Sequence, residues 1–555
     1  MKQQTKLLLF FAIALIVGMS SCKKDDFNIN QNPNEATDST IAYNVILPSA
    51  QNNTARLVAR NWGWLQCYLG YWARSGTYAP NVDEETYTIT TNFQSQIWSN
   101  AYDNLYDYQT MQIQAEKAGA DFYAGIAKIM KAHNFAMLVD IYGNIPYSQA
   151  LQGAAVTTPA YDNGVDVYND LLAQLTEAID QIKNADESET GPNASILTDD
   201  IMFGDNNFSG TDMAEMKVRW VQFANTLKLR ILTKGMNGGL EPNTDNSVGT
   251  PASYVSGIDF AAEFATIAAE GTGFLDFDAE AQPGYQSDKG NPFYNLYVKD
   301  DAGSATANSV YYKANVYAVG DDDQDPGYYA LDGDSRLYLF YDPNGSSKYR
   351  GVAYGLPSST ANAASTLAGI GEGVYRGVDQ PQWILTAAES YFLQAECINR
   401  GFLTGDANYT MTQGIYASYN SLLIPSSYAD DYIAYNIGYP DVDYTASDLG
   451  PGGATGGLFT IISQKWFALN AIAPYEVWSD YRRIDFSPSI NHFVYGESAG
   501  YFAGPAISVY PSNTRTEIPA RLLYPQSEYL YNPANVNAQP SAGSYPFAHV
   551  FWDLN

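Results

Sequence analysis

The chain has 555 residues, and 29 Lys and Arg against 60 Asp and Glu give a net charge of −31, which excludes nucleic-acid binding by counterion release. A hydrophobic fraction of 46% excludes a disordered chain, while three Cys exclude a disulfide scaffold and three His leave little room for a His-built metal site. The 45 Tyr favour contact with an uncharged ligand, because tyrosine combines a flat apolar face with a hydrogen-bonding tip.

The N-terminal region has the pattern of a lipid-anchored secreted protein. A positively charged start leads into an uninterrupted apolar run at 7–17, which fits a signal-peptide core and is too short to span a bilayer. The next residues, GMSSC at 18–22, resemble a bacterial lipobox, although its Met and second Ser depart from the commonest form. We expect a signal peptide at 1–21, acylation of Cys22 and a flexible tether at 22–40. An ordinary secretory signal with a chance cysteine is the alternative.

Helical periodicity begins at residues 56–74. Apolar side chains recur there every three or four residues, on one face of a predicted helix: Val58, Trp62, Leu65, Leu69 and Trp72. Further helices are predicted at 95–117, 122–141, 165–184, 214–235, 258–269, 381–400, 409–422 and 460–472. The helix at 122–141 is expected to stop at Gly143, with Pro146 beyond it.

Between about 185 and 380, and again after 423, the chain is irregular and rich in Gly, Asn, Asp and Tyr. Such long loops are uncommon unless they are functional or packed on a scaffold. Small residues at Ala387, Ala388 and Ala395 allow the close helix approach that helical hairpins need. The sequence therefore predicts a mostly α fold, in which a helical-hairpin scaffold packs against a loop-rich, irregular half within one domain at 41–555.

Several segments together have the pattern of one known family. They read FYAGIAKIMKAHNFAMLVDIYGNIPYS at 122–148, WVQFANTLKLR at 220–230, DSRL at 334–337, YRGVAYG at 349–355, TAAESYFLQAE at 386–396, QKWFALN at 464–470, EVWSDYRRIDF at 476–486 and IPARLLYPQSEYLYNPAN at 518–535. In this order they resemble the SusD/RagB family of nutrient-binding lipoproteins over nearly the whole mature chain. Ser335 stands where the family usually has Pro.

The resemblance implies tetratricopeptide-like helical pairs that support the loop-rich remainder. It also implies a lipid-anchored protein on the outer face of the outer membrane. Such a protein captures oligosaccharides, or peptides in some members, and delivers them to a SusC-like TonB-dependent transporter. Family members carry out no catalysis, so we expect no enzymatic activity, no cofactor and no metal.

Carbohydrate binding requires exposed aromatic faces, with amides and carboxylates beside them to bind hydroxyls. One group of candidate ligand-binding residues consists of Trp64, Tyr68 and Tyr71, which fall off the apolar stripe and so can be exposed, and of Tyr78, Asn81, Asp83 and Tyr87 in the following loop. By resemblance, the family's ligand face includes the loops after this early helix. A second group is Tyr432 and Tyr435, within a tyrosine-dense run at 428–444.

One motif suggests an enzyme instead. Residues 496–500 spell G-x-S-x-G, with Ser498 in the nucleophile position of a serine esterase. However, Gly504-Pro505 would break a following helix after little more than one turn, and His549 is the sole histidine downstream. We therefore interpret the motif as a loop.

Two further alternatives stay open. The acidic run at Asp321–Asp325 has the hard oxygen ligands that Ca²⁺ prefers, but Pro326 stands where an EF-hand needs Gly, so a solvated loop is the simpler interpretation. We expect Asp334, further along, to form a salt bridge or cap a turn. Recognition of peptides by the same architecture is the other alternative to glycan binding.

Overall fold

The computed structural model describes residues 41–60, 62–236, 255–322, 325–327, 329, 333–439, 441–446, 457–484, 507–540 and 546–553. The predicted signal peptide, Cys22, the tether and Ser498 therefore lie outside the described residues, as does part of the acidic run at 321–325. Within the described chain, no helix has both the length and the apolar character needed to cross a membrane.

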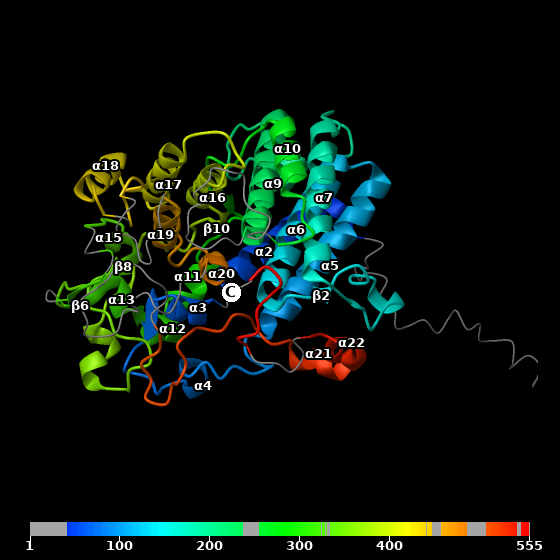
Figure 1. Cartoon of the computed structure of the whole chain (residues 1–555). Helices are drawn as coiled ribbons and strands as arrows, with labels where there is room; N and C mark the ends of the chain where they lie inside the picture. The colour runs from blue at the N-terminus through cyan, green and yellow to red at the C-terminus, as the bar shows by residue number, and fades with distance from the viewer. Residues whose placement is uncertain are drawn as a thin grey trace, which may run out of the picture. The chain divides into compact units, whose positions relative to one another are not determined.

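Long helices form most of the fold. They are α2 (Tyr43–Ala59), α5 (Gln96–Ala118), α6 (Asp121–Tyr142), α7 (Gly164–Asn184), α9 (Met213–Gly235), α16 (Ala387–Asn399), α17 (Ala407–Ser421), α19 (Leu458–Ala468) and α20 (Pro474–Ile484). Neighbours in this series pack together: α2 on α5, α5 on α6, α6 on α7, α7 on α9, α9 on α16, and α16 on both α17 and α19 (Figure 1). The prediction of a mostly α, helical-hairpin scaffold is confirmed.

Local sequence explains where these helices begin and end. Helix α5 ends at Gly119, whose φ of 71° is the left-handed conformation that glycine adopts most easily. Helix α16 begins after Thr386, whose side chain accepts a hydrogen bond from the backbone N–H of Glu389. Gly125 lets α6 approach α7, because a Cβ there would lie 2.6 Å from Ile182 Cγ1.

The predicted continuous helix at 56–74 is wrong. Helix α2 ends at Ala59, the short helix α3 covers Gly63–Tyr68, and residues Trp72–Arg74 form strand β1. Gly70, with φ of 80°, turns the chain between α3 and β1. The residues of the apolar stripe are nevertheless all buried. Their apolar character therefore reflects burial in the packed fold and not one face of a continuous helix.

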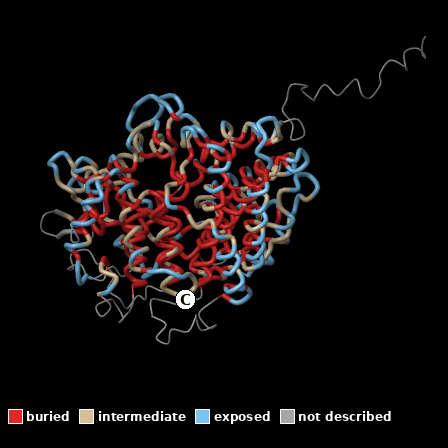
Figure 2. The backbone as a smooth tube through the Cα atoms, turned by 90° about the horizontal axis from the view of Figure 1, so that it is seen from above, coloured by how far each residue is buried: buried red, intermediate tan, exposed pale blue. Residues whose placement is uncertain are grey.

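The loop-rich half consists of short elements. Its helices are α4 (Val82–Glu85), α8 (Ile196–Asp199), α10 (Phe260–Glu270), α11 (Pro292–Tyr297), α12 (Ala307–Tyr311), α13 (Val316–Val319), α15 (Leu337–Phe340), α18 (Ser426–Tyr435), α21 (Gln526–Tyr531) and α22 (Pro533–Asn537). Antiparallel strand pairs join β1 to β5 (Tyr312–Ala314), β2 (Ile145–Pro146) to β3 (Tyr161–Asp162), β4 (Ala279–Ala281) to β10 (Gln382–Leu385), β6 (Gly320–Asp322) to β7 (Asp325–Pro326), and β8 (Tyr341–Asp342) to β9 (Gly369–Ile370). Buried residues concentrate along the packed helices, and exposed ones along the outer loops (Figure 2).

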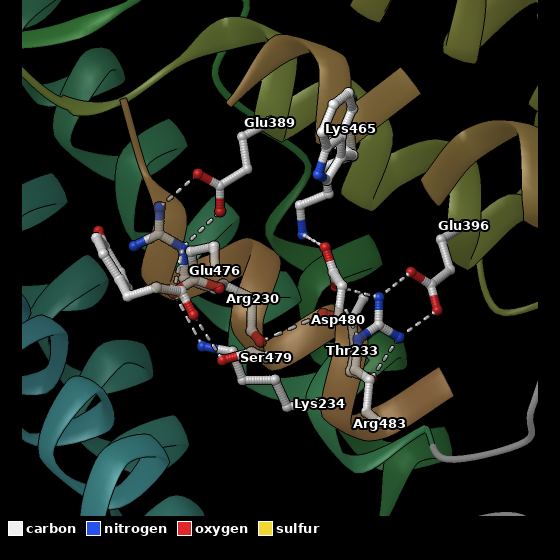
Figure 3. A network of polar contacts seen from close by, with 12 residues as sticks. Arg230, Thr233, Lys234, Glu389, Glu396, Lys465, Glu476, Ser479, Asp480 and Arg483 are labelled. Carbon is white, nitrogen blue, oxygen red and sulfur yellow. Dashed lines mark hydrogen bonds and ion pairs between the residues drawn. The ribbon is translucent and has the colours of Figure 1, made fainter. Parts of the chain in front are cut away.

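A network of buried charges joins five of the long helices (Figure 3). Arg230 Nε lies 2.8 Å from Glu389 Oε1, and Lys234 Nζ lies 2.5 Å from Asp140 Oδ2 and 3.0 Å from Glu476 Oε1. Lys465 Nζ lies 3.0 Å from Asp480 Oδ2. Arg483 bridges Glu396 and Asp480 at 2.6 and 2.7 Å. Burial alone would raise the pKa of Glu396, but the cations of Arg483 and Arg400 outweigh it and hold this pKa at about 2. The interior carboxylates are therefore stabilised by paired cations.

Removal of one buried cation should be costly. We expect Arg483→Met to lower the free energy of unfolding by about 3 kcal/mol or more, because two buried carboxylates lose a partner. The side chain of Arg483 is 0% exposed, whereas that of Lys183, which pairs with Glu270, is 45% exposed. The control Lys183→Met should therefore cost about 1 kcal/mol or less. Denaturant unfolding measures both, and equal small losses would contradict the assigned role of the network.

Candidate ligand-binding site

Four residues of the first predicted ligand-binding group are in the interior. Trp64, Tyr68, Tyr71 and Tyr87 are each at most 1% exposed, so the expectation that the first three are available on the surface is wrong. The Tyr71 ring stacks on Trp466 of α19, with ring centroids 4.6 Å apart, and its hydroxyl donates to the Trp466 carbonyl oxygen at 2.7 Å. Trp64 likewise packs against Trp478 of α20, and Tyr68 against Tyr87 and Tyr354, so scaffold helices and loop segments together bury these off-stripe side chains.

The loop after β1 does present polar and aromatic groups at the surface. Asn81 and Asp83 are exposed around the start of α4, and Tyr78 is half-buried, with its ring centroid 5.3 Å from that of Tyr311. Beneath them, the buried Arg74 pairs with Glu85 at 2.5 Å and donates to the Tyr78 carbonyl oxygen at 2.8 Å. A cation in the interior thus holds the exposed part of this loop in place.

Short strands bring this loop beside three later segments. Strand β1 pairs with β5, the Ala314 N–H of β5 donates to the Ala368 carbonyl oxygen at 3.0 Å just before β9, and β9 pairs with β8. The Ala364 N–H also donates to Thr77 Oγ1 at 2.9 Å. Residues separated by almost 300 positions therefore meet on one surface.

A cleft of about 400 Å³ opens on this surface. Its lining includes Tyr297, Ser309, Lys313, Asp342, Asn344 and Tyr375. The Tyr375 hydroxyl donates to Asp342 Oδ2 at 2.7 Å. Burial lowers the pKa of the Lys313 amine, and the neighbouring Asp342 carboxylate counteracts this effect. We call this space the loop cleft; Tyr311, whose ring packs against that of Tyr78, follows the lining residue Val310 in the chain.

The loop cleft has the chemistry of a site for a polyhydroxylated ligand. It combines ring faces with an ammonium, a carboxylate and an amide, and its size lies within the range of about 300–1,000 Å³ typical of small-molecule sites. Within the described residues, no group of three or more His, Cys, Asp or Glu could hold a metal ion.

The second predicted group divides between interior and surface. The run expected to be irregular after 423 contains helix α18, which buries Tyr432 and leaves Tyr435 70% exposed. Tyr432 accepts a hydrogen bond from Gln464 Nε2 at 2.9 Å and lies beside Arg336. Arg336 in turn binds the Asp334 carboxylate at 2.7 Å, so the predicted salt bridge of Asp334 is present. Helix α18 lies away from α4 in Figure 1, and the two groups do not form one site.

Sequence reasoning missed the residues that line the loop cleft. Lys313, Asp342 and Tyr375 stand far apart in the chain and outside any periodic segment. The one available signal was local: Tyr311 and Tyr312 form an adjacent aromatic pair in an irregular region. The pairing of β5, β8 and β9 that brings these residues together has no motif in the sequence.

The fold therefore combines a helical scaffold with a surface cleft lined by polar and aromatic side chains. The family model described as "Starch-binding associating with outer membrane" matches residues 30–236 and 332–525. The chain belongs to this SusD-like family. No curated protein matches it.

Solved structures agree with this fold. A chitin-binding protein is 20% identical with a TM-score of 0.65, covering 93% of this chain and 100% of its own. A chitin-binding SusD homologue from Flavobacterium johnsoniae is 21% identical with a TM-score of 0.63, covering 92% and 99%. A SusD homologue from Bacteroides fragilis is 21% identical with a TM-score of 0.66, covering 92% and 99%. At these identities the likeness concerns the fold alone.

A buried carboxyl beneath the site should make stability depend on pH. Burial, with a smaller contribution from Glu85, raises the pKa of Glu84 from 4.5 to about 7, although Tyr354 and Asn81 donate to it. The contribution of Glu84 to stability is therefore fully present below pH 4.5 and is lost as pH rises through 7, since the folded state holds this proton more tightly than the unfolded chain.

We expect Glu84→Gln to be more stable than the wild type by on the order of 2 kcal/mol above about pH 8, and to show no advantage near pH 4.5. Denaturant unfolding across this pH range measures the difference. A constant difference between the two proteins at all pH values would contradict ionisation of Glu84 as the cause.

Proposed function

We propose that this protein binds oligosaccharides at the cell surface and that the loop cleft is its principal binding site. The observation that carries the proposal is the cleft itself, which places tyrosine rings beside Lys313, Asp342 and Asn344 on the loop-rich half of a SusD-like fold. Sugar rings stack on tyrosine faces, and charged and amide groups bind their hydroxyls. Two of the structural neighbours are chitin-binding proteins, which supports a polysaccharide ligand.

The half-buried Tyr78 and the exposed Asn81 and Asp83 extend the proposed site beyond the cleft. Tyr435 on α18 offers a separate aromatic surface and stays a candidate contact for ligand or partner. The proposed role is binding without catalysis, so the oligosaccharide leaves the protein chemically unchanged.

We further propose that the protein is anchored in the outer membrane through lipid on Cys22 and delivers its ligand to a SusC-like TonB-dependent transporter. The lipobox-like residues at 18–22 support the anchor, and the family's association with the outer membrane supports the location. Firm anchoring needs more than one acyl chain, which acylation of a single lipoprotein cysteine supplies.

Removal of one cleft ring should weaken glycan binding. We expect Tyr375→Ala to raise the Kd for a bound oligosaccharide about fivefold, because it removes a stacking face worth about 1 kcal/mol. Isothermal titration with oligosaccharides selected from a glycan array measures this. Tyr531→Ala, which removes a 75% exposed ring of α21, is the matched control and should bind normally. Binding of peptides in place of glycans would overturn the ligand class.

The anchor can be tested on the full chain in its own membrane. We expect wild-type protein in the outer-membrane fraction, where it co-purifies with a barrel transporter after detergent extraction, and expect Cys22→Ala in the soluble fraction. Ser21→Ala, which leaves the cysteine intact, is the control. Retention of Cys22→Ala in the membrane would exclude the lipid anchor, and wild-type protein without a transporter would exclude the proposed partner.

A further inference from the structure

A second groove, separate from the loop cleft, lies against the helical scaffold. It has a volume of about 560 Å³ and runs between α16, α17, the segment at 276–282 and the turn at 206–208. We call it the scaffold groove. It shares no lining residue with the loop cleft and contains none of the residues that the sequence predicts to bind ligand.

Aromatic rings line the scaffold groove. Phe208, Phe277, Tyr391 and Tyr416 are all half-buried. Arg219 covers one face of Phe208 at 4.1 Å from the ring centroid, and the Tyr416 hydroxyl donates to Asp430. Tyr391 differs from them, because among the described residues its hydroxyl has no hydrogen-bond partner and its ring no aromatic neighbour. Its ring is therefore available for stacking.

The charges that line the scaffold groove all have one sign. Asp276, Asp278 and Glu280 contribute carboxylates, and the lining includes no Lys or Arg. Asp278 is already engaged, since it accepts from Trp383 Nε1 at 3.1 Å and from the Ala387 N–H at 2.9 Å. It acts as a structural acceptor that fixes the start of α16.

Glu280 is unengaged and, unlike the exposed Asp276, half-buried. In the part of the chain that the structure describes, its carboxylate has no hydrogen-bond or ion-pair partner, while its carbonyl oxygen accepts from Asn207 Nδ2 at 2.8 Å and holds the segment in place. Burial and the nearby Asp278 raise the pKa of Glu280 to about 7, and Arg376, which lies outside the lining, opposes this only in part. A cationic donor from outside would satisfy this carboxylate.

We propose that the scaffold groove is a second binding site and that it takes an oligosaccharide carrying free amino groups. In this proposal the Tyr391 ring stacks on a sugar ring, and the carboxylates of Asp276 and Glu280 pair with ammonium groups of the oligosaccharide. The amides of Gln413 and Asn420 form hydrogen bonds with its hydroxyls. An acetylated amino sugar has no ammonium to pair with Glu280, and an acidic sugar would meet like charge. A basic peptide would supply the charge but no ring for Tyr391.

Titration of the detergent-extracted full chain with glucosamine oligomers, N-acetylglucosamine oligomers and oligolysine of equal length tests this proposal. We expect tight binding of the glucosamine oligomer alone, weakened about tenfold or more by Glu280→Gln and by Asp276→Asn, and steeply weakened by salt. Glu189→Gln, an exposed acid outside the groove, is the charge-matched control. Tyr375→Ala, which alters the loop cleft and not the scaffold groove, should leave this binding unchanged, so that failure at one site is distinguishable from failure at the other.

Three results would overturn the proposal. Equal binding of the acetylated oligomer would show that charge does not select the ligand, and equal binding of oligolysine would assign the groove to basic peptides. Absence of glucosamine-oligomer binding, or binding unaffected by both Glu280→Gln and Asp276→Asn in proteins with wild-type unfolding temperatures, would remove the site altogether.

Discussion

The buried ion pairs hold together helices that are distant along the chain. Arg230 and Lys234 of α9 meet Glu389 of α16 and Glu476 of α20, and Arg483 of α20 returns to Glu396 of α16. A buried charge is costly unless a partner and additional hydrogen bonds compensate it. The helices can therefore pack only in the arrangement that brings these groups together, and each long helix of the network depends on its neighbours for that compensation.

The scaffold in turn positions the loop-rich half through aromatic residues. Trp466 of α19 stacks on Tyr71, and Asn470, just after α19, donates to the hydroxyls of Tyr329 and Tyr341 at 3.2 and 3.0 Å. Tyr341 donates to the Tyr71 carbonyl oxygen at 2.9 Å. Each of these tyrosines buries its ring and still satisfies its hydroxyl, which removes the cost of an unpaired polar group. Irregular backbone around the loop cleft is thereby held as firmly as a regular element.

The two candidate binding surfaces differ in charge, although the whole chain is acidic. The loop cleft contains the ammonium of Lys313 beside the carboxylate of Asp342, a balance that suits neutral ligands. The scaffold groove combines tyrosine rings with carboxylates alone. A ligand that cannot pair with the charged side chains of a surface binds there more weakly. The specificity of each surface therefore depends on its own charged side chains, and not on the net charge of −31.

The sequence by itself determined the helical scaffold and the family. Helical periodicity and stop signals act over a few residues, so α5, α6, α7 and α9 lie within one or two residues of their predicted bounds. The segments that carry the family resemblance also contain Arg230, Glu389, Lys465 and Arg483, but no local pattern reveals that these charges meet.

Only the tertiary structure decided which aromatic residues are exposed. Tyr68 and Tyr78 stand ten positions apart, yet the first is in the core and the second is half-buried. Tyr68 is covered by Tyr87 and by Tyr354, which lies far along the chain, whereas Tyr78 packs against Tyr311 and keeps part of its surface open. Burial is a property of the complete packing, and a short stretch of sequence does not reveal which distant segments will cover it.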